Sequence, residues 1–225
     1  FIGCDSNEKC RKLEFDNPRI SIIIGNANTD KAEKELLKLA QDFNIIIDDG
    51  SHTPRDIIKS FTRYFNHLVD DGLYIIEDLH TSYWVEYEGG LHDPYSTMSF
   101  LMRLADVINF EHWRIDQGRE EFLLPYAQYY DVNFDEFELS KIHSIQFMNS
   151  LCVIQKRSIN ENTLGKRIVV GSEEPVSKGY LDFNGMSIHD IPVKVKDDSS
   201  FDIFSLINQI KHLKSEIEIR EEVIE

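Results

Sequence analysis

The chain of 225 residues contains 41 % hydrophobic and 11 % aromatic residues. This length and composition predict one folded domain of about 150 residues with an appendage, and they argue against a disordered chain. The formal net charge of −16 argues against a nucleic-acid-binding protein, because binding to phosphates requires clustered Lys and Arg side chains.

Cysteine usage and hydropathy indicate a cytoplasmic protein. The three cysteines, Cys4, Cys10 and Cys152, are an odd number without metal-binding spacing, so no disulfide framework is predicted. No apolar run approaches the roughly 18 residues of a transmembrane segment, and no signal peptide is recognisable. The chain opens in an apolar strand without a methionine, so we expect a fragment whose natural N-terminus lies upstream.

Short apolar strands alternate with amphipathic helices in the first half of the chain. This alternation predicts an α/β fold, a Rossmann-like parallel sheet with helices on both faces. We expect strands at residues 1–5, 19–25, 43–49 and 73–76, and helices at residues 8–15, 31–42 and 54–68.

The third of these helices has clear start signals. Thr53 is the expected N-cap, Pro54 suits the first helical position, and Asp56 stands three residues after the cap. This spacing predicts a capping box, in which the two side chains satisfy backbone N–H groups at the helix start.

The pattern is looser in the second half. Residues 85–95 contain Gly89, Gly90 and Pro94 and are predicted to form a loop that could act as a lid over the site. Residues 116–138 have no clear pattern. Further along, we expect a helix at residues 96–110 and an antiparallel strand pair at residues 140–148 and 150–156.

The folded domain is expected to end near Arg157. This divides the chain into a core at residues 1–157, an irregular extension or linker at residues 158–200, and an amphipathic helix at residues 201–225. Apolar residues at three-four spacing in the last segment predict a coiled coil that joins a second copy or another partner. A helix that packs on its own domain is the alternative.

Three predicted strands end in acidic residues, namely Asp5, the pair Asp48–Asp49 and the pair Glu77–Asp78. The carboxyl ends of parallel strands lie at one edge of a sheet, where ligands bind. Carboxylates that converge there repel one another unless a cation or a hydroxyl-rich ligand lies between them. The arrangement therefore predicts a ligand site at this edge.

Oxygen donors from Asp49, Glu77 and Asp78 would suit Mg²⁺ or Mn²⁺ better than zinc. His52 follows Asp49 by three residues across a turn that Gly50 permits, so its imidazole could take a proton in the same cleft. Taken alone, His52 would fit a surface histidine near a helix start better than a catalytic residue.

A nucleotide could bind beside this group. The carboxylate of Asp5 can accept both hydroxyls of a ribose, although it could instead cap the helix that follows. Asn26 and Ala27 follow the second strand and could read an adenine edge, although an asparagine there is also a common turn residue. We place Asp48 in the same predicted cofactor site.

Three motifs resemble the macrolide sugar O-methyltransferases that act on mycinamicin and macrocin. They are Phe-Ile-Gly-Cys-Asp at residues 1–5, Asp-Asp-Gly-Ser-His at residues 48–52, and Gly-Leu-Tyr-Ile-Ile-Glu-Asp-Leu-His-Thr-Ser-Tyr-Trp at residues 72–84. The hairpin at residues 144–156 also looks like the last strand pair of that family, so the resemblance spans about residues 1–157.

The resemblance implies a class I fold that transfers a methyl group from S-adenosylmethionine to a sugar hydroxyl. It implies Mg²⁺ held by Asp49, Glu77 and Asp78, with His52 as general base. It also implies a ribose contact at Asp5 and an adenine contact at Asn26 and Ala27. The chain departs from the family pattern in having Asn26 where Asp is common, and in lacking the first strand and its glycine-rich loop.

Tyr83 and Trp84 are candidates to line the acceptor pocket, with buried core positions as the alternative. The expected acceptor carries neighbouring hydroxyls on a small glycoside or a polysaccharide. A nicotinamide oxidoreductase is disfavoured because the chain has no Gly-x-Gly-x-x-Gly and no Tyr-x-x-x-Lys motif. The other alternative is a non-catalytic or degenerate methyltransferase-like module that recruits a partner through its C-terminal helix.

Overall fold

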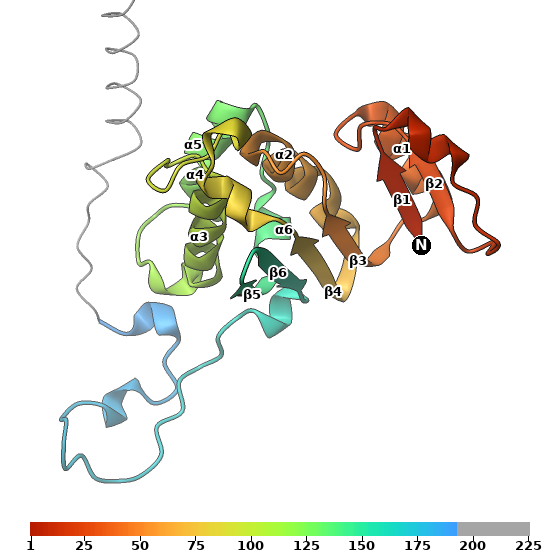
Figure 1. The fold of residues 1–225 in the computed structure, drawn as a ribbon. Helices are drawn as coiled ribbons and strands as arrows, with labels where there is room; N and C mark the ends of the chain where they lie inside the picture. The colour runs from red at the N-terminus through yellow and green to blue at the C-terminus, as the bar shows by residue number, and fades with distance from the viewer. Residues whose placement is uncertain (193–225) are drawn as a thin grey trace, which may run out of the picture.

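The structure is a computed structural model that describes residues 1–192 of the chain (Figure 1). The strands are β1 (Ile2–Asp5), β2 (Ser21–Ile24), β3 (Phe43–Asp48), β4 (Leu68–Ile76), β5 (Ile142–Met148) and β6 (Leu151–Lys156). The α-helices are α1 (Asp30–Leu39), α2 (Pro54–Tyr64), α3 (Thr97–Ile108), α4 (Arg119–Phe122), α5 (Leu124–Tyr130) and α6 (Glu136–Leu139). The coiled coil predicted at residues 201–225 lies outside the described residues.

Eight 3₁₀ helices connect these elements in the described part of the chain. They are η1 (Glu8–Lys12), η2 (Phe65–His67), η3 (Leu79–Tyr83), η4 (Val85–Tyr87), η5 (Phe110–His112), η6 (Ile159–Glu161), η7 (Leu181–Phe183) and η8 (Ile188–Asp190). Two of them, η3 and η4, follow Glu77 and Asp78, the two residues after β4.

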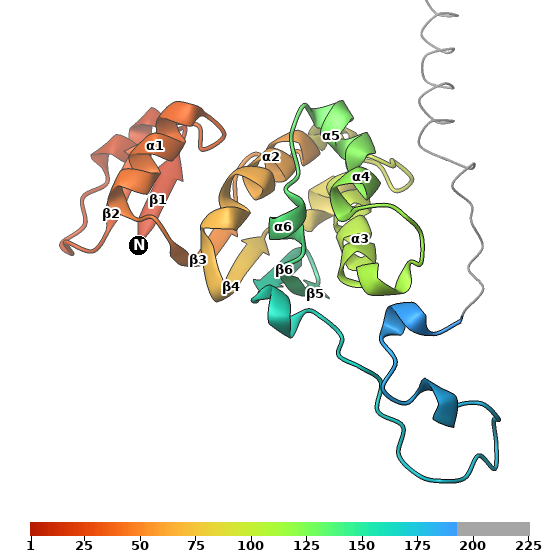
Figure 2. The same ribbon diagram turned by 180° about the vertical axis from the view of Figure 1, so that it is seen from behind.

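The strands form two sheets. β1 pairs with β2 in parallel, and the larger sheet has the order β3-β4-β6-β5, in which β3 and β4 are parallel and the hairpin β5–β6 is antiparallel. Both views show β1 on the side of its pair that is nearer to β3 (Figures 1 and 2). Within residues 1–192 no backbone ladder joins β1 to β3, as expected if one strand of the sheet is missing from these residues.

Side chains connect the β1–β2 part to the rest of the domain. The amide of Asn28 donates to the backbone oxygen of Asp56 over 3.0 Å, and the hydroxyl of Tyr64 donates to the backbone oxygen of Ala27. Arg63 of α2 also forms ion pairs with two acidic residues of α1. These contacts hold the loop after β2 against α2.

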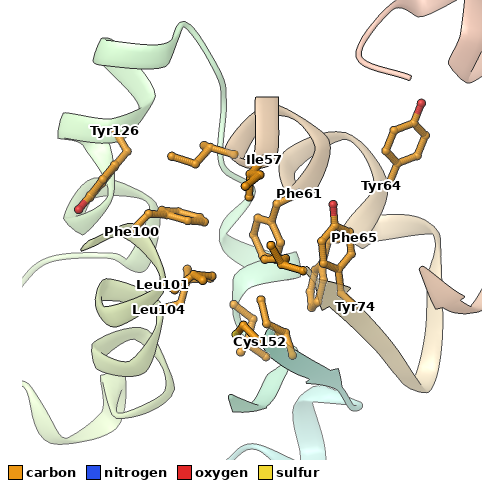
Figure 3. Close-up of a cluster of buried hydrophobic side chains, with 14 of the residues drawn as sticks. Ile57, Phe61, Tyr64, Phe65, Tyr74, Phe100, Leu101, Leu104, Tyr126 and Cys152 are labelled. Atoms are coloured by element: carbon orange, nitrogen blue, oxygen red, sulfur yellow. The ribbon is translucent and has the colours of Figure 1, made fainter. Parts of the chain in front are cut away.

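One apolar core lies between α2, α3 and α5 on one side and the larger sheet on the other (Figure 3). Phe61 is at its centre, with ring centroids 5.6 Å from Tyr74 and 5.8 Å from Phe100. Tyr126 of α5 closes the core 5.5 Å from Phe100. The unassigned residues 116–138 therefore supply three short helices, and two of the tyrosines they carry, Tyr126 and Tyr130, are buried.

The opposite face of β3 is open within the described residues. Ile45 and Ile47 are 55 % and 53 % exposed, whereas parallel sheets are normally covered on both faces. Among the described residues, helices thus cover one face of this strand, whereas helices were predicted on both faces. The other face of the strand exposes apolar side chains.

Three local predictions were wrong. The helix predicted at residues 8–15 is the 3₁₀ helix η1, which ends at Lys12. The helix predicted at residues 54–68 ends at Tyr64, and Leu68 is the first residue of β4. The predicted capping box is also absent: Thr53 is the N-cap of α2 but its side chain makes no capping hydrogen bond. Instead, Ser51 donates to Asp56 over 2.5 Å.

Among residues 1–192, the longest and most apolar helices still fall short of what a bilayer crossing requires. The cytoplasmic location inferred from the cysteines stays a prediction.

The core packing gives a stability prediction. Replacing Phe100, which is fully buried, with alanine is expected to lower the free energy of unfolding by about 3–5 kcal/mol, because it leaves a cavity among Phe61, Tyr126 and Phe134. Urea denaturation followed by circular dichroism measures this. Met102→Ala on the exposed side of the same helix is the control and should change stability by less than about 0.5 kcal/mol. Equal effects of both substitutions would contradict this packing.

Candidate metal and acceptor site

Asp49, His52 and Asp78 come together beyond the ends of β3 and β4. One ligand atom from each lies within 4.8 Å of those of the other two. The Nε2 atom of His52 lies 3.8 Å from Oδ1 of Asp49 and 3.6 Å from Oδ2 of Asp78. The imidazole is 17 % exposed, and the two carboxylates are 62 % and 49 % exposed. A half-buried imidazole thus lies between two solvent-accessible acids.

Proximity alone does not make this group a metal site. Two carboxylates this far apart repel by only about 1 kcal/mol when solvent separates them. The backbone gives a second argument, since His52 and Asp78 have φ angles of 59° and 55°. This left-handed conformation costs on the order of 1 kcal/mol per residue and is concentrated at functional sites.

Thr81 connects these two left-handed residues. Its hydroxyl lies 2.7 Å from the backbone oxygen of Asp78 and 3.3 Å from that of His52. Thr81 is 2 % exposed, so water does not compete for the hydroxyl. One buried side chain therefore contacts both loops that carry the site, and the sequence did not reveal this contact.

Glu77 has a different place from that expected. Its backbone N–H donates to the backbone oxygen of Asp48 over 3.0 Å and continues the β3–β4 pairing. Glu77 is not part of the group formed by Asp49, His52 and Asp78. Two of the three predicted metal ligands, Asp49 and Asp78, are thus brought together, and a metal contact by Glu77 stays a prediction.

Asp48 points toward the core side of the sheet edge. The hydroxyl of Tyr74 donates to its carboxylate over 3.3 Å, and Tyr74 shares a hydrogen bond of 2.8 Å with Ser60. Burial raises the pKa of the Asp48 carboxyl, and hydrogen bonds from Ser60, Tyr74 and the backbone of Gly50 oppose part of this rise. Asp48 thus supports the turn that carries Asp49, and its cofactor contact stays a prediction.

The predicted nucleotide contacts lie at the ends of β1 and β2. The carboxylate of Asp5 is exposed and accepts the backbone N–H of Asn7 over 2.7 Å. The cap of η1 is Asn7, so the alternative reading of Asp5 as a cap was wrong. Asn26 accepts the backbone N–H of Asn28 over 2.8 Å, which is a turn role, and the backbone oxygen of Ala27 accepts Tyr64.

The segment after Asp78 is folded and not an open loop. Trp84 accepts backbone N–H groups from Tyr87 and Gly89, and Ser82 accepts that of Gly90. A side chain at Gly89 would lie 2.4 Å from the backbone oxygen of Ser82, so this close approach requires glycine. Movement of a lid over residues 85–95 stays a prediction.

Tyr83 and Trp84 are each 47 % exposed, so the core alternative for both is wrong. Trp84 contacts His80, with ring centroids 4.7 Å apart. His80 is fixed by Ser150 in the turn of the β5–β6 hairpin, whose hydroxyl lies 2.6 Å from its Nδ1 atom. Neither His80 nor Ser150 was predicted, because they are 70 positions apart in the sequence.

Curated proteins support the resemblance. The chain is 32 % identical over 118 residues to the 8-demethyl-8-alpha-L-rhamnosyl tetracenomycin-C 2'-O-methyltransferase of Streptomyces olivaceus. It is 34 % identical over 123 residues to the demethylmacrocin O-methyltransferase of Streptomyces fradiae. These matches cover 52 % and 53 % of this chain but 30 % of each relative. The chain thus spans about a third of the length of the curated relatives it matches. No family model matches it.

Solved structures support the fold. The chain is similar to two crystal forms of MycE methyltransferase from the mycinamycin biosynthetic pathway in complex with Mg and SAH, with TM-scores of 0.57 and 0.58 and 24 % identity. The matches cover 71 % and 76 % of this chain and 38 % and 40 % of the solved chains. The predicted Rossmann-like class I methyltransferase fold is confirmed, as is the resemblance to the macrolide sugar O-methyltransferases.

Proposed function

We propose that the protein is a cytoplasmic O-methyltransferase that transfers a methyl group from S-adenosylmethionine to a sugar hydroxyl with the help of Mg²⁺ or Mn²⁺. The observation that carries this proposal is the convergence of Asp49, His52 and Asp78 beyond adjacent parallel strands. The named relatives act on sugars attached to macrolide and tetracenomycin compounds. A sugar-bearing acceptor, either a small glycoside or a polysaccharide, follows from the same resemblance.

The donor set fits a hard divalent cation. Asp49 and Asp78 offer exposed carboxylate oxygens, which Mg²⁺ and Mn²⁺ prefer. Asp49 and Asp78 would hold the ion, with Glu77 as the further ligand implied by the family. A bound ion would supply positive charge that lowers the pKa of an acceptor hydroxyl.

His52 is assigned the role of general base. Its Nε2 atom faces both carboxylates, so the imidazole is held where an acceptor hydroxyl would approach the cluster. The ring would take the hydroxyl proton as the oxygen attacks the methyl carbon.

The cofactor contacts would come from strand ends. Asp5 remains exposed, and an ionised carboxylate that accepts one backbone N–H keeps acceptor capacity for ribose hydroxyls. Asn26 and Ala27 would contact the adenine, and Asp48 belongs to the same cofactor site. S-adenosylmethionine, when bound, supplies a methyl group that is already activated for transfer, so the protein must chiefly align the acceptor.

Calorimetry with S-adenosylhomocysteine, with and without Mg²⁺, tests the proposal directly. Transfer of tritiated methyl groups to 4-nitrophenyl α-L-rhamnopyranoside, which carries neighbouring hydroxyls, tests the activity. Binding and metal-dependent transfer are expected. Absence of both would favour the non-catalytic module.

The ligand assignment predicts different effects for neighbouring carboxylates. Asp78→Asn is expected to weaken Mn²⁺ binding by at least about tenfold, because it removes a charged ligand at the centre of the cluster. Electron paramagnetic resonance of free Mn²⁺ measures the affinity. Glu77→Gln is the matched comparison: an equal loss would show that Glu77 is also a ligand, whereas no loss would remove it from the set. A wild-type affinity in Asp78→Asn would contradict the site.

The assigned base predicts a separation of catalysis from binding. His52→Ala is expected to lower the methyl-transfer rate by about 10²–10⁴-fold and to leave the affinities for Mn²⁺ and S-adenosylhomocysteine within about threefold. Radiometric assays and calorimetry measure the two effects. If the variant lost Mn²⁺ as strongly as Asp78→Asn does, His52 would be a metal ligand and not the base.

The tie formed by Thr81 predicts a rescue by a conservative variant. Thr81→Val keeps the shape but loses the hydroxyl, so Mn²⁺ affinity is expected to fall about tenfold as the two loops lose their common support. Thr81→Ser keeps the hydroxyl and should retain most of the affinity. If valine and serine had the same effect, the hydroxyl would have no part in positioning the site.

A further inference from the structure

The outer edge of β2 has no partner strand among the described residues. β2 pairs only with β1 there, and the backbone N–H groups of Ser21 and Gly25 donate to β1. Alternate residues of a strand direct their backbone groups to opposite sides, so those of Ile22 and Ile24 face away from β1. Two N–H and two C=O groups on this edge are therefore available to an added strand.

A groove of about 460 Å³ runs along this edge. Ile22 and Ile24 line it, and so do Leu13 and Phe15 from the chain after η1. Leu13 and Phe15 are 53 % and 48 % exposed, so about half of each apolar side chain is left uncovered. An incoming strand would thus find backbone partners and apolar side chains in one place.

The groove is cationic at one end. Lys31 lies on the first turn of α1, shortly after β2 ends, and Arg11 lies on η1, which follows the parallel strand β1. Both cations therefore lie at the carboxyl ends of the two strands, and both line the groove, as does Glu35 one turn after Lys31. Arg11 pairs with Glu8 over 3.1 Å, but this pair is exposed and therefore weak. An acidic residue that accompanies an incoming strand would be attracted to this end.

A second open edge lies in the extension after the hairpin. Arg167 makes two backbone hydrogen bonds of 2.8 Å with the turn at residues 184–186, and the backbone N–H of Val169 donates to a side chain of that turn over 3.1 Å. Ile168 and Val170 alternate with these two residues, so their backbone groups face the other way. Their side chains are 82 % and 91 % exposed. We call residues 167–170 the extension edge.

The two edges match each other. Each presents two β-branched residues at alternate positions, which are Ile22 and Ile24 on β2 and Ile168 and Val170 on the extension edge. Residues of this type are favoured in paired strands. Both views show the two edges on opposite sides of the structure (Figures 1 and 2), so they do not meet within one chain. A second copy of the chain can bring them together.

Charge sets the direction of this pairing. Two copies that each carry a net charge of −16 repel each other unless opposite charges meet at the contact. Glu173 is exposed and follows Val170 by three residues. A parallel alignment brings Glu173 toward the end of the groove where Arg11 and Lys31 lie, whereas an antiparallel alignment takes it to the other end.

We propose that the extension edge of one copy adds as a strand to the outer edge of β2 in a second copy, in parallel with β2 and with Glu173 toward Arg11 and Lys31. The apolar side chains of the extension edge then lie in the groove, where both apolar surfaces are removed from water. This interface between two copies is separate from the metal site and from residues 201–225.

Cross-linking tests the contact in the full chain. Cys10 also lines the groove, so Val170→Cys places a thiol on the added strand beside it. Treatment with bismaleimidoethane is expected to give a covalent dimer on a denaturing gel, with the bridge between position 170 and Cys10 identified by mass spectrometry of its peptides. Adding Cys10→Ser to this variant should remove the bridge.

Val176→Cys is the matched control, because Val176 is 94 % exposed on the same extension but lies outside the extension edge. It should give at least about tenfold less dimer, since nothing holds it beside Cys10 of another copy. Equal amounts of dimer from Val170→Cys and Val176→Cys would overturn the proposal.

Hydrogen exchange reports on the backbone groups themselves. The amides of Ile22 and Ile24 are expected to exchange at least about tenfold more slowly at high than at low protein concentration, because an added strand protects them. Val170→Lys should abolish this difference, since it places a further cation in the groove, and Val176→Lys should keep it. Exchange that is independent of concentration in the wild-type protein would show that no second copy binds this edge.

A charge exchange tests the parallel alignment. In the Val170→Cys background, Glu173→Lys and Lys31→Glu should each lower the yield of the bridge to Cys10 about threefold, and the two together should restore it. If the double variant cross-linked as poorly as the single ones, Glu173 would not lie beside Lys31 and the parallel alignment would be wrong.

Discussion

The hydroxyl of Thr81 links the backbone oxygens of His52 and Asp78, two residues that follow different strands. Each of these residues has a left-handed backbone, which neither would adopt without support from its surroundings. Since Thr81 is buried, its hydrogen bonds form away from competing water. The distance between His52 and the two acids, and hence any chemistry at this edge, depends on that link.

The left-handed turn at Asp78 brings this acid beside His52. Along a strand, successive side chains point to opposite faces. Glu77 still belongs to the strand pairing through its hydrogen bond to Asp48, whereas the chain turns at Asp78 and directs its carboxylate toward His52. One of two adjacent acids therefore enters the cluster.

The sequence could predict that Asp49, His52 and Asp78 lie together, because the ends of buried strands can be recognised in it. The apolar runs before Asp49 and Asp78 are short and rich in isoleucine, and parallel strands bring their ends to one edge. That reasoning cannot distinguish Glu77 from Asp78, because the φ angle of a residue after a strand depends on tertiary contacts. The capping box failed for the same reason. The carboxylate of Asp56 accepts a hydrogen bond from Ser51, whereas the sequence suggested that it would bond to the backbone at the start of the helix.

Contacts between distant segments explain what the sequence did not show. Ser150 holds His80 across 70 residues, and Tyr87 lies beside His52 across 35 positions. The motif at residues 72–84 ends before Tyr87, and the glycines at residues 89 and 90 resembled a flexible loop. Gly89 instead allows a close approach to the backbone of Ser82, and Tyr87 lies two residues before it.

Asp78 couples the two imidazoles of the site. One of its oxygens faces His52 and the other faces His80, so a change that moves this carboxylate alters its contacts with both rings. The side chains of Asp49 and Asp78 are 62 % and 49 % exposed. Solvent therefore weakens the electrostatic interactions of both carboxylates, and the position of Asp78 depends on the backbone turn that carries it more than on its charge.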